Sequence, residues 1–121
     1  MGKPRTLLAL TDPAILDTFL RLLAPAFEIV GMHDDVTVLP HVARRERPDV
    51  VVLGLPALPQ AGLHAVSALR DMSGALCIIV VAADATFAAR AFQCGASAYI
   101  LETASEADLL AGIRAAVSGR P

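Results

Sequence analysis

Five short apolar runs, separated by amphipathic segments, set the pattern of this chain. The most uniform is residues 49–56, Asp-Val-Val-Val-Leu-Gly-Leu-Pro, in which β-branched side chains predominate and a Gly and a Pro come at the end. Such a run is typical of a central strand in a parallel sheet, because helices cover both of its faces. Further strands are predicted at residues 5–10, 27–31, 75–82 and 98–101.

The segments between and after these runs carry apolar residues at the three- and four-residue spacing of amphipathic helices. They predict helices over residues 12–23, 34–42, 62–72, 84–94 and 105–118. Residues that favour a helix start stand before them, namely Thr11 or Asp12 ahead of Pro13, Asp34 or Asp35, Asp84, and Ser105. Gly95 is suited to a left-handed conformation at a helix end.

Five strands alternating with five helices predict an α/β fold of the (βα)5 type. Right-handed crossovers would make it a three-layer sandwich around a parallel sheet. The flavodoxin-like strand order 2-1-3-4-5 is the common solution for such a chain, although the pattern does not itself contain that order. The 121 residues suit a single domain, and no repeat or internal linker divides them.

Composition excludes several classes of function. The net charge of -2 gives no general attraction to nucleic acid or to an anionic membrane. No apolar run approaches the ~20 residues that span a bilayer, and no signal peptide is visible, so we expect a cytoplasmic protein without membrane contact. Cys77 and Cys94 lack metal-ligand spacing and are expected to be small buried hydrophobic residues. The basic stretch at residues 44–47 is interrupted by Glu46, and a solvated helix end that favours cations explains it better than a phosphate site.

Six landmarks occur in a fixed order along the chain: Pro13, residues 27–31, residues 47–53, Gly62, Gly95-Ala96 with Tyr99, and the tail at 109–121. Together they resemble, over essentially the whole length, the receiver domain of bacterial two-component response regulators, and within them the NarL/FixJ type. The resemblance implies that residues 1–121 form one receiver-like domain with an aromatic switch position at Tyr99. It also implies a helix-turn-helix output domain that is absent from this chain and through which DNA would be bound.

Receivers close their first strand with two acidic residues that hold Mg²⁺, their third with the phosphoacceptor Asp, their fourth with a hydroxyl residue and their fifth with a Lys. The matching positions here are Leu10 and Thr11, Gly54, Ala82, and Glu102. A register shift of one residue would restore only Asp12 to the acidic pair. Because Gly54 supplies no nucleophile and Glu102 reverses the charge of the Lys, the resemblance implies a degenerate pseudo-receiver without catalytic residues, cofactor or metal.

Other reactive groups give no stronger candidate. Asp12, Asp84 and Glu102 could ring the same edge of the sheet, but helix caps and a solvated loop residue account for them more simply. Two acids without a base or nucleophile make a poor catalytic set. No Gly-rich phosphate loop follows the first strand, and the three His residues share no spacing. We therefore do not expect an enzyme.

Two hypotheses of different classes remain. The leading one is a phosphorylation-independent regulatory domain that forms a homodimer or docks on a partner regulatory protein. Its contact face is expected to contain Ala88, Phe92, Tyr99, Leu110 and Ile113. The alternative is a small-molecule sensor whose ligand enters an emptied pocket bounded by Leu10, Gly54, Leu55, Ala82 and Glu102.

Overall fold

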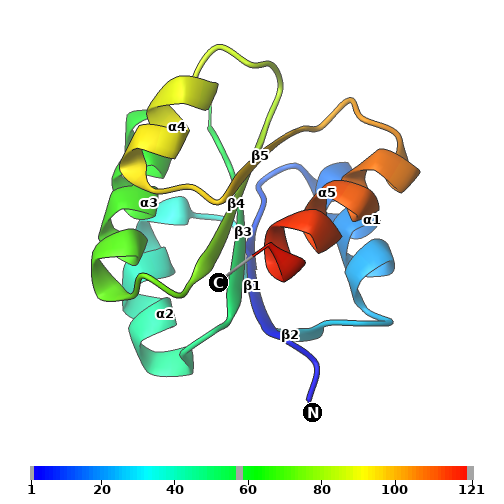
Figure 1. Ribbon diagram of the computed structural model, residues 1–121, viewed down its shortest axis with the longest axis horizontal. Coiled ribbons are helices and arrows are strands. Elements are labelled where there is room, and N and C mark those ends of the chain that lie inside the picture. Colours follow the sequence, from blue (N-terminus) through cyan, green and yellow to red (C-terminus); the bar gives the residue numbers. More distant parts are fainter. Residues whose placement is uncertain (1, 57–58, 120–121) are drawn as a thin grey trace.

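The computed structural model of the chain describes residues 2–56 and 59–119. A five-stranded parallel sheet lies at the centre, with α2, α3 and α4 on one side and α1 and α5 on the other (Figure 1). The strands are β1 (Arg5–Ala9), β2 (Glu28–His33), β3 (Val50–Gly54), β4 (Cys77–Ala82) and β5 (Ala98–Leu101). Their order is β2-β1-β3-β4-β5, which confirms the flavodoxin-like three-layer fold.

The helices are α1 (Pro13–Leu23), α2 (Leu39–Glu46), α3 (Gln60–Met72), α4 (Ala88–Cys94) and α5 (Glu106–Ser118). Two of the expected caps are confirmed. The carboxylate of Asp12 accepts hydrogen bonds from the backbone N–H groups that open α1, and the Ser105 hydroxyl accepts one from the N–H of Asp108 in α5. Gly95 ends α4 with a φ of 116°, the left-handed conformation that its lack of a side chain allows.

Two expected helix starts are wrong. The segment predicted as one helix over residues 34–42 is a 3₁₀ helix, η1 (Val36–Val38), followed by α2, which continues to Glu46. Asp35 caps η1, whereas α2 starts anew with Pro40 in its first turn, where a missing N–H costs nothing. Asp84 does not cap α4: its carboxylate accepts the N–H of Thr86 in the preceding turn, and α4 begins after Phe87 without a side-chain cap.

α3 begins at Gln60, two residues earlier than expected. The loop predicted before it includes residues 57 and 58, which lie outside the described residues.

The core consists of two apolar clusters, one on each face of the sheet. Along β3, Val51 and Leu53 belong to the cluster under α2, α3 and α4, while Val50 and Val52 belong to the cluster under α1 and α5. These four side chains are fully buried, which confirms the prediction that β3 is covered on both faces. Cys77 is buried in one cluster and Cys94 packs against the other, so the sheet separates them.

Within the described ranges, no helix is long and apolar enough to cross a membrane.

Candidate functional site

The carboxyl ends of the five strands meet at one edge of the sheet, the upper edge in Figure 1. Leu10 follows β1, Gly54 and Ala82 end β3 and β4, and Glu102 follows β5. The register pairs Gly54 with Val81 and Ala82 with Leu101, and the backbone N–H of Glu102 donates to the carbonyl of Ala82. The structure therefore brings together the positions that the sequence placed at one site.

Leu10 occupies the place beside Gly54. Its side chain is only 4% exposed, and a Cβ atom added to Gly54 would lie 3.3 Å from the Leu10 Cδ2 atom. The cavity that remains, bordered also by Thr11 and Glu102, has a volume of about 40 Å³. Since a water molecule needs ~10–15 Å³ of such space, there is room for a few waters and not for a metabolite, whose pockets measure ~300 Å³ or more.

The residues at this edge do not fit Mg²⁺, which prefers several oxygen ligands with carboxylates among them. Asp12 and Glu102 are the carboxylates that line the cavity. The Asp12 carboxylate already accepts hydrogen bonds from the N–H groups of Ala14 and Ile15, at 2.9 and 3.4 Å. Over residues 2–56 and 59–119, no group of three His, Cys, Asp or Glu side chains is placed to hold a metal ion.

A second hollow, of about 320 Å³, adjoins the first along the same edge. It is lined by Leu55, Pro56, Ala82, Ala83, Asp84, Phe87, Tyr99 and Glu102. The single pocket predicted for a small-molecule sensor is thus two separate hollows. Leu10 and Gly54 border only the small cavity, and Ala82 borders only the larger hollow. At this edge of the sheet, a ligand of the size of a metabolite would have to use the hollow beside Tyr99.

Tyr99 ties β5 to the segment that precedes α4. Its hydroxyl donates a hydrogen bond to the backbone carbonyl of Asp84, with an O···O distance of 2.7 Å. Partial burial raises the pKa of the Tyr99 phenol above its ordinary value, and the nearby Asp84 carboxylate acts in the same direction. The side chain is therefore positioned to report any displacement of this segment.

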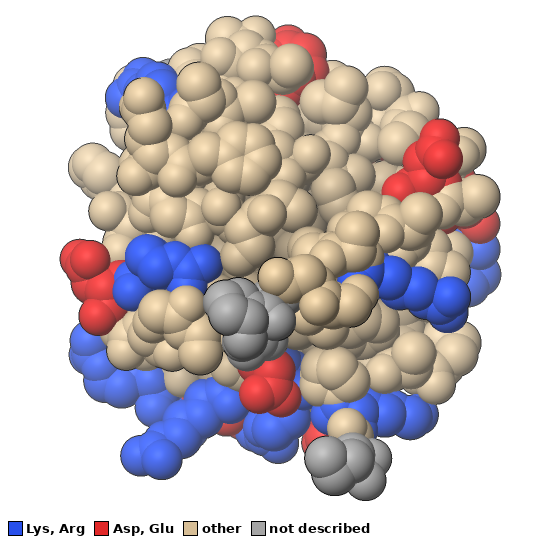
Figure 2. Space-filling view, in the orientation of Figure 1, with Lys and Arg blue, Asp and Glu red and all other residues tan. Residues whose placement is uncertain are grey.

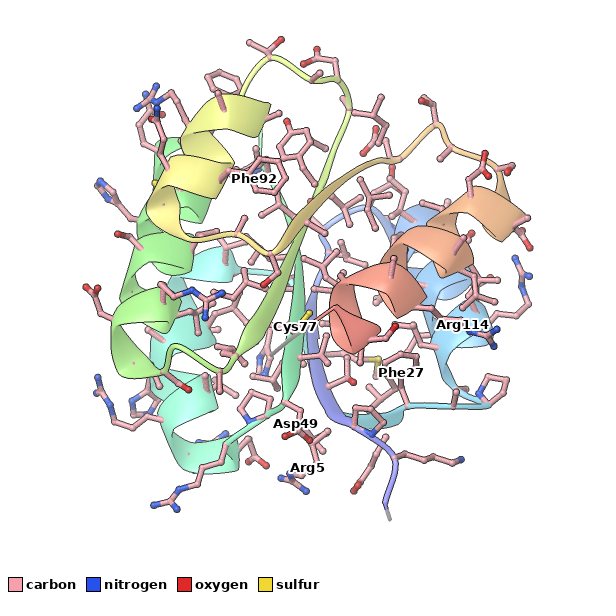
Figure 3. All side chains as sticks on the ribbon, viewed as in Figure 1. Arg5, Phe27, Asp49, Cys77, Phe92 and Arg114 are labelled. Atoms are coloured by element: carbon pink, nitrogen blue, oxygen red, sulfur yellow. The ribbon has the colours of Figure 1, made fainter. Side chains whose placement is uncertain are left out.

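The face formed by α4, β5 and α5 is turned toward the viewer in Figures 1 and 2, and its centre carries few charged side chains. Phe92 projects from α4 and is 50% exposed (Figure 3). Ala88, Tyr99 and Leu110 are half-buried.

The prediction of Ile113 as a contact residue is wrong, because Ile113 is fully buried in the cluster beneath α5. Leu101, which the sequence reasoning missed, is exposed on the same face. No local pattern marked it, because helices cover both faces of the sheet and the alternation of side chains along β5 does not show which of them stays exposed.

No family model matches the sequence, and no curated protein matches it. Among solved structures, the chain is similar to a two-component response regulator of the LuxR family from Aurantimonas sp. SI85-9A1, with 28% identity and a TM-score of 0.84 over 98% of this chain and 88% of that one.

Two further solved structures have the same fold as this chain. The signal receiver domain of the response regulator NarL from Mycobacterium tuberculosis is 19% identical, with a TM-score of 0.86 over 99% of this chain and all of that one. The RcsB response regulator of Salmonella typhimurium is also 19% identical, with a TM-score of 0.81, and this chain covers 62% of it. The structural neighbours of this chain are therefore receiver domains of response regulators, and they support a role in signalling or regulation.

Proposed function

We propose that this chain is a regulatory protein-interaction domain that acts in the cytoplasm without being phosphorylated. The observation that carries the proposal is the burial of Leu10 against Gly54 at the edge where receivers carry out phosphoryl transfer. An apolar side chain fills the space beside a residue that has no nucleophile. Both changes would have to be reversed before the site could accept a phosphoryl group.

The charge at this edge supports the same proposal. Transfer of a phosphoryl group to a carboxylate needs a nucleophile, a divalent cation and a cationic side chain to stabilise the product. Glu102 is an exposed carboxylate at the position of the expected cation, and Ala82 has no hydroxyl to donate. A phosphoryl group placed here would meet negative charge in place of positive charge.

The test is incubation with acetyl phosphate, or with beryllofluoride, in the presence of Mg²⁺. We expect no change in intact mass, in sedimentation or in tyrosine fluorescence. The fluorescence reports the switch position alone, because Tyr99 is the only tyrosine and the chain has no tryptophan. A receiver domain that retains its phosphoacceptor Asp, treated in parallel, provides the positive control. A Mg²⁺-dependent gain of one phosphoryl group in mass would contradict the proposal.

The interaction is assigned, as part of the same proposal, to the α4-β5-α5 face, with a second copy or a partner regulatory protein as the occupant. Exposed apolar side chains at Phe92 and Leu101 support this, since such groups mark contact surfaces when they share one face. The test compares Phe92→Asp with Met32→Asp by sedimentation over a range of concentrations. Met32 on β2 is equally exposed, at 53%, but lies away from this face.

We expect Phe92→Asp to weaken self-association and Met32→Asp to leave it unchanged. The reverse result, or an effect of neither substitution on a chain that does self-associate, would show that another face is used. A chain that stays monomeric at all concentrations would exclude the homodimer and leave the partner protein.

The hollow beside Tyr99 favours small-molecule sensing as a second candidate function. Its volume of about 320 Å³ lies at the lower end of the range for ligand pockets. A ligand held there should raise the thermal midpoint of the wild-type chain, because it binds the folded state alone. Ala83→Phe should abolish the rise, since Ala83 is exposed and lines the hollow. A metabolite panel without any shift would count against this candidate.

We also infer that the regulated output is transcription, with DNA bound by a domain outside residues 1–121. The support is the resemblance to NarL/FixJ receivers together with the RcsB structure, which concerns DNA interaction and extends well beyond the matched part. Sequencing the gene past codon 121 tests this directly. A different type of following domain would overturn the inference.

A further inference from the structure

A groove opens at the opposite edge of the molecule, where α2 and α3 end. Its volume is about 370 Å³, and it is lined by Ala43, Arg44, Arg47, Pro48, Met72, Ser73 and Leu76. Leu76 and Ala43 are buried in its floor, and Met72 and Pro48 are half-buried. The two arginines stand exposed at its rim. We call this feature the α2–α3 groove.

The positive charges of the two rim arginines are not paired with a carboxylate of the described chain. Within the described part of the chain, the guanidinium groups of Arg44 and Arg47 form no hydrogen bond or ion pair. The nearby carboxylate of Glu46 is already engaged by the Arg45 Nε at 3.3 Å and by the Arg5 Nη2 at 3.5 Å. The groove therefore combines an apolar floor with two uncompensated cations.

Arg47 stands in a backbone conformation that ordinarily favours glycine. It ends α2 with a φ of 51°, and it is the one non-glycine residue with positive φ in the described ranges. Glycine would adopt this conformation without the steric cost that a side chain brings. An arginine here presents a charged side chain at the groove in spite of that cost.

The surroundings extend the groove along α3. Arg44 and Met72 also border a flatter hollow with Ala68 and Asp71. Lys and Arg side chains gather along the lower edge of the molecule in Figure 2, the edge at which α2 ends in Figure 1. Asp71 is the acidic side chain among the residues that line either hollow.

We propose that the α2–α3 groove binds an acidic amphipathic segment of a partner protein. Apolar side chains of the segment would pack on Met72 and Leu76, and its carboxylates would pair with Arg44 and Arg47. Charge complementarity of this kind favours fast and selective docking, and an amphipathic helix in an apolar groove is a common mode of peptide recognition. Nucleic acid suits the groove poorly, because a phosphate backbone offers nothing to cover the apolar floor.

This proposal goes beyond the function proposed above. It concerns the edge of the sheet opposite Gly54, and none of its lining residues belongs to the α4-β5-α5 face. Binding in the groove and association through the other face can therefore fail or succeed separately.

The test measures fluorescence anisotropy of a fluorescein-labelled amphipathic peptide with Leu at three- and four-residue spacing and Glu at the intervening positions. A peptide with Gln in place of each Glu is the control. We expect the Glu peptide to bind at least about tenfold more tightly than the Gln peptide, and to lose affinity as salt is raised, because the rim contacts are ionic.

Three variants locate the binding. Arg44→Glu should weaken it about tenfold or more. Arg47→Gly should weaken it several-fold while leaving the urea midpoint unchanged or higher, because glycine relieves the left-handed conformation. Arg114→Glu is the matched control: it makes the same charge change on an exposed side chain of α5 that does not line the groove, and should alter binding by less than about twofold. Phe92→Asp should have no effect.

Failure of the Glu peptide to bind, or equal binding of the Gln peptide, would overturn the proposal. So would an Arg114→Glu variant that loses as much affinity as Arg44→Glu, since the effect would then be one of overall charge. Displacement of the peptide by inorganic phosphate at low millimolar concentration would identify the site as an anion site and would also overturn it.

Discussion

The guanidinium of Arg70 joins segments that lie far apart in the sequence. Its Nε and Nη2 atoms donate to the backbone carbonyl of Gly95 at 3.0 and 2.8 Å, and its Nη1 donates to the carbonyls of Ser73 and Gly74 at 3.0 Å. These carbonyls follow the ends of α3 and α4, where backbone oxygens lack helical partners and carry partial negative charge. One cation thus satisfies two helix ends.

Arg70→Ala should destabilise the fold by about 2 kcal/mol, because charge-assisted hydrogen bonds are lost and several carbonyls are left without partners. Arg70→Lys should recover only part of this, since an ammonium group cannot reproduce the fork of donors. Urea unfolding measures both. Arg114→Ala, on the exposed surface of α5, is the control and should stay within about 0.5 kcal/mol of the wild type. Equal effects of Arg70→Ala and Arg114→Ala would contradict this role.

The position of Gly54 in the candidate site leaves little room for a side chain. A Cβ atom there would lie 3.3 Å from the buried Leu10 side chain, closer than most real contacts of this kind. Gly54→Asp should therefore lower stability by roughly 1–3 kcal/mol through overpacking, and should still form no acyl phosphate. Gly74→Asp is the matched control, because a Cβ atom at Gly74 meets nothing within 4 Å. Mass spectrometry after acetyl phosphate treatment and urea unfolding test the two parts, and a labelled Gly54→Asp variant would contradict the first.

At the scale of elements, an ion pair joins two helices that begin 93 residues apart, α1 at residue 13 and α5 at residue 106. The Arg21 guanidinium on α1 donates two hydrogen bonds to the Glu106 carboxylate at the start of α5, with distances of 2.8 and 2.7 Å. The hydrogen bond from Arg21 is the main reason that the pKa of Glu106 lies below its ordinary value, and it raises the pKa of Arg21.

The pH dependence follows from the direction of the Glu106 shift. A carboxylate with a lowered pKa in the folded state contributes stability above its ordinary range, and that contribution is lost as the pH falls through the lowered folded value. We expect Arg21→Gln to raise the pKa of Glu106 toward its ordinary value, as measured by NMR titration of the side-chain carboxyl carbon. Because the pair is exposed, added salt should shrink the difference. An unchanged titration in Arg21→Gln would show that the pair does not form in solution.

At the scale of the whole molecule, the sheet is shared by two cores. Alternate side chains of β1, β3 and β4 enter the cluster under α2, α3 and α4 or the cluster under α1 and α5. Phe19 is buried in one cluster and Leu69 in the other, both at 1% exposure or less. Since neither helical layer has a core of its own without the strands, the two layers should unfold together.

Phe19→Ala and Leu69→Ala should each cost about 3 kcal/mol, as large-to-small changes in a buried core do. Each should move the whole transition, with circular dichroism and Tyr99 fluorescence giving the same urea midpoint. Thr18→Ala, at a half-buried position on α1, is the control for Phe19→Ala and should stay near the wild type. Separate midpoints for the two signals would contradict a shared core.

Much of the fold was predictable because its determinants are local. Alternating apolar runs, helix caps at Asp12 and Ser105 and the left-handed Gly95 all act within a few residues. The errors came where neighbouring segments compete. Pro40 supports a new helix start and so divides the segment after Asp35, and Asp84 caps the turn that precedes α4, not α4 itself. In both places, the sequence was compatible with the predicted helix start and with the observed one.

The sequence by itself determined which chemical groups the edge of the sheet contains, because a Leu, a Gly, an Ala and a Glu stand at the strand ends whatever their surroundings. Only the tertiary structure decided that Leu10 closes the space beside Gly54, that Ile113 is core and Leu101 is surface, and that the emptied pocket is divided in two. The reason is physical. The residue type at each position is given by the sequence alone, whereas burial, cavity shape and the pairing of Arg21 or Arg70 depend on segments that folding brings together from distant parts of the chain.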